Sequence, residues 1–329
     1  MAGVNGGAFA APAGRLHHLP LALFAAPMGL GGLGLAWRQA AHGFGVPAAV
    51  GEALLALAAL VYAALLVLHL RRGLAHPAVL ATDLRHPVRA AFAGAVSIGL
   101  MLNAAALLPY APISALVLWA VAVLLHLAIG AVVLRRLIAA PNDPAMLTPP
   151  ILIPLVGNLV APVVGARLGL ETLSWMLFGI GLLLWLMLQP LVLHRLIAGP
   201  PLPPLLRPTL VILLAPPSVA CLAVAALTGS ALTPVALGLF GLAAFMALVL
   251  LSLVRSFAAM PFAPSWWAWT FPPAAFATAL SSVAQNAGSP GLQVLAVWVL
   301  LGVTAITALV ALRTFGAAVS GDLLQPERG

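Results

Sequence analysis

Charged residues are scarce in this chain. Only 6% of its 329 residues are charged, whereas 64% are hydrophobic and the mean hydropathy is +1.16. A soluble domain carries about 25% charged residues, so a water-soluble fold would have too few polar groups to cover its surface. This scarcity excludes soluble enzymes, nucleic-acid-binding proteins and disordered proteins. We therefore expect an integral membrane protein, and the length of the apolar runs favours helices.

The chain contains no lysine and a single cysteine. Cys221 is the single cysteine, which excludes an intramolecular disulfide and a cysteine-based metal cluster. The net charge of +8 comes from 14 arginines and 6 acidic residues. In a membrane protein such an excess is typical of cytoplasmic loops, so no nucleic-acid partner is expected. None of the eight histidines has the spacing of metal ligands, and no cofactor or metal is expected.

Ten membrane-spanning helices are predicted from the charge-free runs, because one span needs about 20 apolar residues. They form one transmembrane domain over 19–314, between an N-terminal tail (1–18) and a C-terminal tail (315–329). If the N-terminus is cytoplasmic, 12 of the 14 arginines lie inside and only Arg38 and Arg167 lie outside. The positive-inside rule therefore predicts that both termini are cytoplasmic. The expected spans are 19–37, 48–70, 87–108, 112–136, 149–168, 172–196, 208–228, 233–256, 264–286 and 291–314.

Proline and glycine are concentrated in the odd-numbered predicted helices. Proline frees the carbonyl four residues before it, and freed groups within lipid need partners from protein or water. We therefore predict an all-α fold of five helical hairpins, with the odd helices in an inner pore ring and the even helices in an outer ring. The alternative is that proline and glycine are simply more frequent in membrane helices. The prolines expected to kink the pore helices are Pro27, Pro154, Pro162, Pro216, Pro217, Pro272 and Pro273.

The predicted inner helices contain no aspartate or glutamate. A path for cations normally carries acidic rings, so this absence favours anions, with selectivity set by pore width and helix-end dipoles. A proton-coupled carrier usually needs an intramembrane Asp, Glu or His. The one mid-membrane histidine, His126, lies on a predicted outer helix and is interpreted as structural. The side chains expected to line the pore are Phe24, Asn103, Asn158, Ser218 and Thr270.

The aromatic segment 264–273 carries the most specific signal. It reads Pro-Ser-Trp-Trp-Ala-Trp-Thr-Phe-Pro-Pro. Its first two tryptophans fit the aromatic belt at a membrane interface, and Phe271 lies deeper, directly before a double proline that restricts its backbone. A bulky ring held there can plug a narrow pore. Ordinary core packing is the alternative interpretation.

Four stretches of the chain together resemble a known family. The first is residues 20–37, and the second is His86-Pro87-Val88-Arg89. The third consists of two motifs, Val156-Gly157-Asn158 and Ala215-Pro216-Pro217-Ser218. The fourth is residues 266–272. In this order they resemble the tellurite-resistance/dicarboxylate transporter family, which includes bacterial TehA proteins and plant guard-cell slow anion channels. Ala25 stands where relatives often have glycine, and Pro273 adds a second proline where one is common.

The resemblance implies a homotrimer of ten-helix protomers, each with its own pore, in a bacterial inner membrane. It places the pore-blocking phenylalanine of the family at Phe271. Family members pass small inorganic anions such as chloride and nitrate, and others carry malate or sulfite or are tied to tellurite resistance. The implied function is an anion-selective channel gated by Phe271. The alternative is a secondary carrier for dicarboxylate, sulfite or tellurite species. An enzyme is not expected, because no paired carboxylates or nucleophile–base pair lies within the predicted spans.

Overall fold

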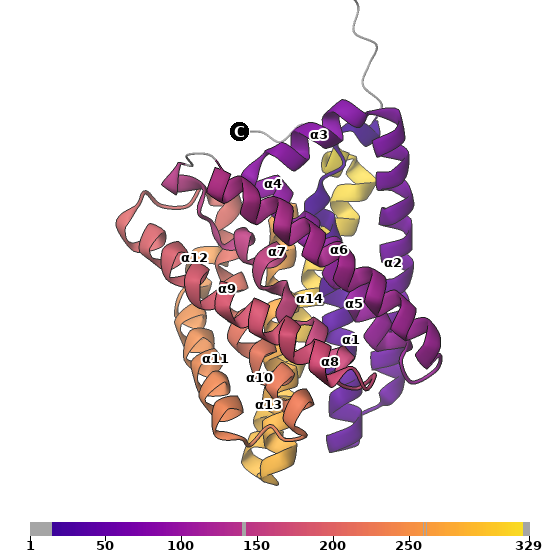
Figure 1. The fold of residues 1–329 in the computed structure, drawn as a ribbon, viewed down its shortest axis with the longest axis vertical. Helices are drawn as coiled ribbons and strands as arrows, with labels where there is room; N and C mark the ends of the chain where they lie inside the picture. The colour runs from indigo at the N-terminus through magenta and orange to yellow at the C-terminus, as the bar shows by residue number, and fades with distance from the viewer. Residues whose placement is uncertain (1–14, 140–142, 259, 261, 325–329) are drawn as a thin grey trace, which may run out of the picture.

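The protein is described by a computed structural model that covers residues 15–139, 143–258, 260 and 262–324. The predicted tails lie partly outside these residues, which begin with η1 (Arg15–His18) and end with η8 (Asp322–Leu324). Helices make up the fold, and the described residues contain no strand, which confirms the prediction of an all-α protein. The two terminal elements contact each other, so both described ends of the chain lie on one side of the molecule (Figure 1).

Long continuous helices alternate along the chain with broken helical segments. Figure 1 shows α6 and α9 crossing the front of the molecule, with α2 along one edge and α11 along the other. The continuous helices are α2 (Ala48–Ala75), α6 (Pro112–Ala139), α9 (Glu171–Ala198), α11 (Pro234–Ser252) and α14 (Pro290–Ser320). Each broken segment joins shorter pieces: η2 (Leu21–Phe24) with α1 (Ala25–Phe44); α4 (Pro87–Ala91) with α5 (Ala93–Leu107); η4 (Pro149–Ile151), α7 (Leu152–Val156), η5 (Gly157–Leu159) and α8 (Ala161–Gly165); η6 (Pro204–Leu214) with α10 (Ala215–Thr228); and η7 (Pro264–Trp269) with α13 (Phe271–Ala287).

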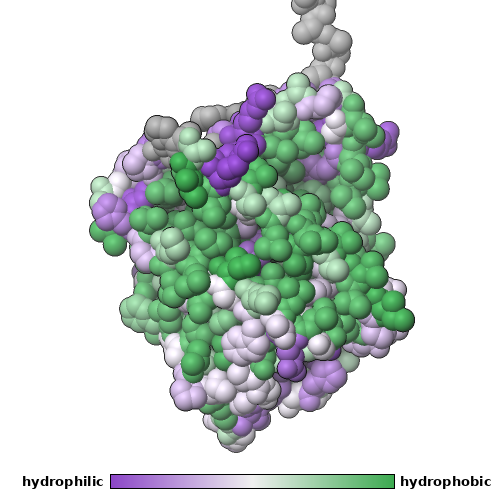
Figure 2. Space-filling view, in the orientation of Figure 1, coloured by the Kyte–Doolittle hydropathy of each residue, from purple (hydrophilic) through white to green (hydrophobic). Residues whose placement is uncertain are grey.

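Broken segments form the interior and continuous helices form the surface. In the most apolar window of Leu21–Phe44, Val88–Leu107 and Pro204–Thr228, 83%, 67% and 67% of the residues are buried, against 22% to 39% in the continuous helices. The inner helices contact one another in a closed cycle, from α1 to α5, to α7 and α8, to α10, to α13 and back to α1. Hydrophobic residues cover the middle of the face in view, and hydrophilic residues lie toward both its ends (Figure 2).

Two of the ten predicted spans are not among the helices that are long and apolar enough to cross a membrane. Only eight helices among the described residues are long and apolar enough to cross a membrane. The segment predicted as one helix over 149–168 is divided at Gly157 into short pieces, and the segment predicted over 264–286 starts as the 3-10 helix η7 before α13. The predicted cytoplasmic loop after the second span is also helical, because α2 runs on to Ala75 and α3 (Pro77–Arg85) follows it. The remaining short elements are η3 (Pro144–Met146) and α12 (Val254–Ala258).

The prolines expected to kink continuous helices lie instead at the starts of α-helices. Pro27 is the third residue of α1, and the two double prolines follow the first residues of α10 and α13. Pro154 and Pro162 likewise lie in the first turns of α7 and α8. The first four N–H groups of an α-helix have no intrahelical acceptor, so a proline there removes no helical hydrogen bond. The prolines therefore lie where the inner segments change between helical elements.

A close approach between α5 and α7 requires glycine at position 94. A Cβ atom added to Gly94 would lie 2.8 Å from both Cα and N of Pro154, which are backbone atoms that cannot turn aside. We expect Gly94→Ala to lower the free energy of unfolding by about 1–3 kcal/mol, as overpacking does. Thermal unfolding in detergent measures this. Gly179→Ala on α9 is the control, because a Cβ there meets nothing within 4 Å; equal losses in both variants would contradict the packing argument.

Candidate functional site

Two cavities inside the ring of broken segments meet at Phe271. A narrow cavity of about 50 Å³ and a wide cavity of about 280 Å³ share three wall residues, Val160, Val219 and Phe271. Phe271 is the first residue of α13 and only 7% of its surface is exposed. These three side chains therefore form a neck that separates one cavity from the other.

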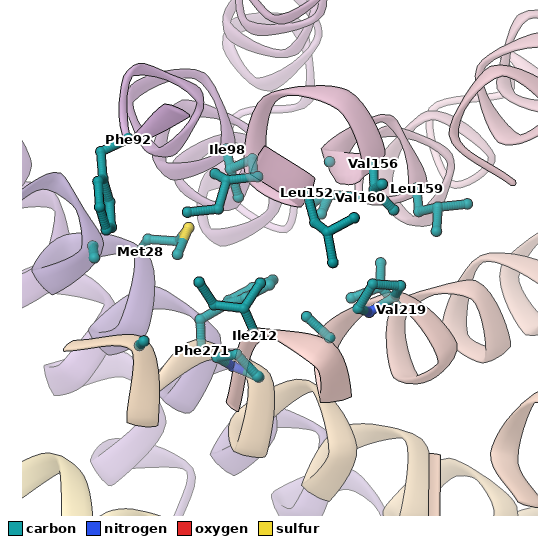
Figure 3. A pocket seen from close by; sticks show the side chains of 17 residues that line it. Met28, Phe92, Ile98, Leu152, Val156, Leu159, Val160, Ile212, Val219 and Phe271 are labelled. Carbon is teal, nitrogen blue, oxygen red and sulfur yellow. The ribbon is translucent and has the colours of Figure 1, made fainter. Parts of the chain in front are cut away.

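The narrow cavity is apolar on every side. Its 17 wall residues are all Ala, Met, Phe, Ile, Leu, Val, Gly or Pro, and the close-up shows the labelled side chains converging from several ribbons, with Ile212 and Phe271 across from Ile98 and Leu152 (Figure 3). All five broken segments contribute to the wall. Ala25, Phe92 and Ala215, where three of the segments change helix, belong to it as well. The breaks in the inner helices thus lie around one common space.

Glycines of α1 make room for the start of α13. A Cβ atom added to Gly32 would lie 2.8 Å from Cδ2 of Phe271, and one added to Gly29 would overlap the side chain of Thr270. Because α1 has no side chains at these two positions, the ring of Phe271 lies directly against its backbone. The local sequence therefore fixes both the depth of the ring and the helix that supports it.

Comparison with known proteins identifies the family. The family model for voltage-dependent anion channels matches residues 18–315. The chain belongs to the voltage-dependent anion channel family. This confirms the resemblance drawn from the four sequence stretches, and the family description, that of a channel, agrees with the expectation that the protein is not an enzyme.

Two plant proteins described as S-type anion channels align with parts of the chain. It is 29% identical over 171 residues to the S-type anion channel SLAH2 of Arabidopsis thaliana, a match that covers 51% of this chain and 33% of the plant protein. It is 33% identical over 118 residues to SLAH3 of the same plant, which covers 36% of this chain and 18% of that protein. The chain thus spans a third or less of the length of these two relatives.

Four polar residues were predicted to line a pore. Each of them donates a hydrogen bond to a main-chain carbonyl of its own helical segment. Asn103 donates to the carbonyl of Gly99, Asn158 to Leu155, Ser218 to Leu214 and Thr270 to Trp267. A polar side chain in a helix can satisfy its donor locally in this way, by bonding to the carbonyl three or four residues before it. Among the described wall residues of the two cavities, none of these four is present.

Phe24, the fifth predicted lining residue, points toward an outer helix. Its ring packs edge-on against Tyr62, with centroids 5.6 Å apart, and lies 5.0 Å from the ring of His69; both partners are on α2. It is 1% exposed and is absent from the described walls of both cavities. His126, interpreted as structural, is fully buried on α6 with its Nδ1 atom 2.8 Å from the Ser97 hydroxyl of α5. This bond links an outer helix to an inner one, as expected for a structural histidine.

Sequence reasoning missed the two valines of the neck. Val160 and Val219 are ordinary apolar residues in a chain that is rich in them. The one available signal was the position of Val219 three residues after Pro216, which places both on the same face of α10. The wide cavity also has a polar part that was not predicted as a site; it includes Arg38 and Arg167.

Arg89, at the start of the second inner segment, belongs to an ion-pair cluster away from both cavities. Its Nη1 atom lies 2.7 Å from Oδ1 of Asp83, and the other oxygen of this carboxylate pairs with Arg72. Arg72 and Asp83 are 2% and 5% exposed. The buried carboxylate thus holds the ends of α2, α3 and α4 together.

We expect Arg89→Ala to cost at most about 1 kcal/mol of stability, because the Arg89 side chain is 43% exposed and ion pairs open to solvent are weak. Asp83→Ala should cost about 3–5 kcal/mol, because it leaves the buried Arg72 unpaired. Thermal unfolding of the two variants measures the difference. If Arg89→Ala folds normally but changes the anion preference of an opened channel, then Arg89 lies at the mouth of the path rather than in a structural cluster.

Proposed function

We propose that this protein is an anion channel in which small inorganic anions, such as chloride and nitrate, cross each protomer along the two cavities. The proposed gate is Phe271. The observation that carries this proposal is that Phe271 belongs to the walls of both cavities and is almost fully buried between them. A path blocked only by an aromatic side chain opens when that side chain moves, without rearrangement of helices.

The chemistry of the walls supports anions over cations. Among the described residues that line the two cavities there is no aspartate or glutamate, while Arg38 and Arg167 line the wide one. A narrow apolar passage favours ions that lose water easily, so nitrate should pass more readily than chloride. Membership of a family described as anion channels points the same way.

The proposed architecture is the one expected from the sequence. Ten membrane segments form five hairpins, and the five broken segments surround the path. The closed cycle of contacts among α1, α5, α7, α8, α10 and α13 and their greater burial support it. We further propose a homotrimer in a bacterial inner membrane with both termini cytoplasmic; the position of η1 and η8 on one side fits an even number of crossings.

The test is electrical. Purified protein in a planar bilayer, with asymmetric chloride or nitrate, should carry anion current that does not saturate when the gate residue is removed. A secondary carrier for dicarboxylate, sulfite or tellurite species would instead give slow, saturable uptake into liposomes and no such current. The absence of anion current in the bilayer, together with substrate uptake into liposomes, would overturn the channel proposal.

A further inference from the structure

The wall of the wide cavity changes character along α13. Phe271, Ala275, Thr278, Ser282 and Asn286 all line the cavity, and they are spaced by four, three, four and four residues. This spacing puts them on one face of an α-helix. The face runs from an aromatic ring at the neck, through a methyl group and two hydroxyls, to an amide at the far end. An ion moving along it toward the neck would exchange polar neighbours for apolar ones.

Arg38 is a cation of this cavity, but its charge is compensated. Its guanidinium binds both oxygens of Glu52 at 2.7 Å and also donates to the carbonyls of Ala105 and Ala106. These carbonyls belong to the last turn of α5, where they have no acceptor role within the helix. Arg38 therefore fastens α1 to α2 and α5, and it has little capacity left for a ligand.

Most other polar groups in the wall are also paired. Gln39 and Gln285 hydrogen-bond to each other in both directions, at 2.8 and 3.0 Å. Thr278 donates to the carbonyl of Ala274, and Asn286 donates to that of Ser282. These bonds leave few donors free to bind a ligand in the cavity.

Arg167 differs from Arg38 in having no such partners. Within residues 15–139, 143–258, 260 and 262–324, its guanidinium has neither a hydrogen-bond nor an ion-pair partner, and the hydroxyl of Ser282 has no hydrogen bond. An arginine stays charged at neutral pH. Its five N–H donors suit planar and spherical anions alike.

We propose that the wide cavity is an anion-binding vestibule in which Arg167 holds a small inorganic anion and Ser282 offers a second donor. Its role as the entrance to the neck rests on the proposed channel function, but binding itself does not require an open neck. The volume of about 280 Å³ leaves room for the anion together with part of its hydration shell. Arg38, the other arginine of the wall, is the structural one.

The experiment measures binding in the closed, wild-type protein. The melting temperature in detergent is followed as nitrate replaces gluconate at constant ionic strength. A ligand that binds only the folded state raises stability with its concentration, so nitrate at ten times its dissociation constant should raise the melting temperature of the wild type by about 3 °C. Arg167→Gln should abolish the rise, and Arg167→Lys, which keeps the charge, should retain most of it.

Arg85→Gln is the matched control, because it removes an equal charge from an exposed position on α3, outside the cavity. It should leave the nitrate effect unchanged. No rise in the wild type, or an equal rise in the wild type and Arg167→Gln, would overturn the vestibule. Failure of the channel proposal would give a different result. Nitrate would still raise the melting temperature of the wild type, but the Phe271→Ala variant would carry no current in the bilayer.

Discussion

Phe271→Ala is expected to raise the anion conductance of the purified protein by about tenfold or more. A hydrophobic constriction blocks ions because water leaves it, and each 1.4 kcal/mol removed from the barrier increases the rate about tenfold. The ring of Phe271 is the largest of the three neck side chains, and the other two are valines. Its removal joins the narrow and wide cavities into one continuous space. Phe271→Leu should conduct at an intermediate level, because leucine leaves part of the neck filled.

The measurement is single-channel or macroscopic current in planar bilayers with asymmetric nitrate. Phe276→Ala is the matched control: it removes the same side chain from the same helix, but Phe276 stacks on Phe240 of α11, with ring centroids 5.9 Å apart, and is not among the described wall residues. It should conduct no more than the wild type. If Phe271→Ala protein folds well but carries no more anion current than the wild type, then Phe271 is not the gate.

The burial of the broken segments agrees with the predicted inner helices, but the residues that line the two cavities are not the polar ones named from the sequence. Proline and glycine marked the helices that the structure buries, because their freed backbone groups need protein partners. The residues that face inward could not be counted from the sequence, because each inner segment is divided into shorter helical elements. A 3-10 helix has 3.0 residues per turn and an α-helix 3.6, so the phase counted from one end is lost at the break. Asn158 and Ser218, expected to line a pore, are accordingly not among the described wall residues of the two cavities.

The two arginines predicted to lie outside, Arg38 and Arg167, show a second limit of sequence reasoning. Arg38 and Arg167 look alike as isolated charges between predicted spans. Only the fold brings Glu52, 14 residues further along the chain, against Arg38 and leaves Arg167 without an acidic partner among the residues that the structure describes. Phe271 was recognisable in advance because its surroundings, three tryptophans before it and two prolines after it, are chemically unusual. The neck valines were not, because their role depends on position alone.

Val219→Asp is the second change for which we expect a large effect, when it is combined with Phe271→Ala. Val219 lies on α10, is 5% exposed and belongs to the walls of both cavities. Any anion that crosses the neck must pass this residue. A carboxylate about 5 Å from the ion, at an effective dielectric constant of about 20, repels it by roughly 3 kcal/mol, which is about a hundredfold in rate.

The pH dependence distinguishes repulsion from a change of shape. A carboxyl group repels anions only in its ionised form, so the aspartate of this variant is neutral in acid and charged in base. Its anion current should therefore be small at pH 8 and recover toward pH 5. Val219→Thr in the same Phe271→Ala background has nearly the shape of valine without a charge, and it should conduct at both pH values. If Val219→Asp conducts as well as Val219→Thr at pH 8, anions do not pass this neck and the path lies elsewhere.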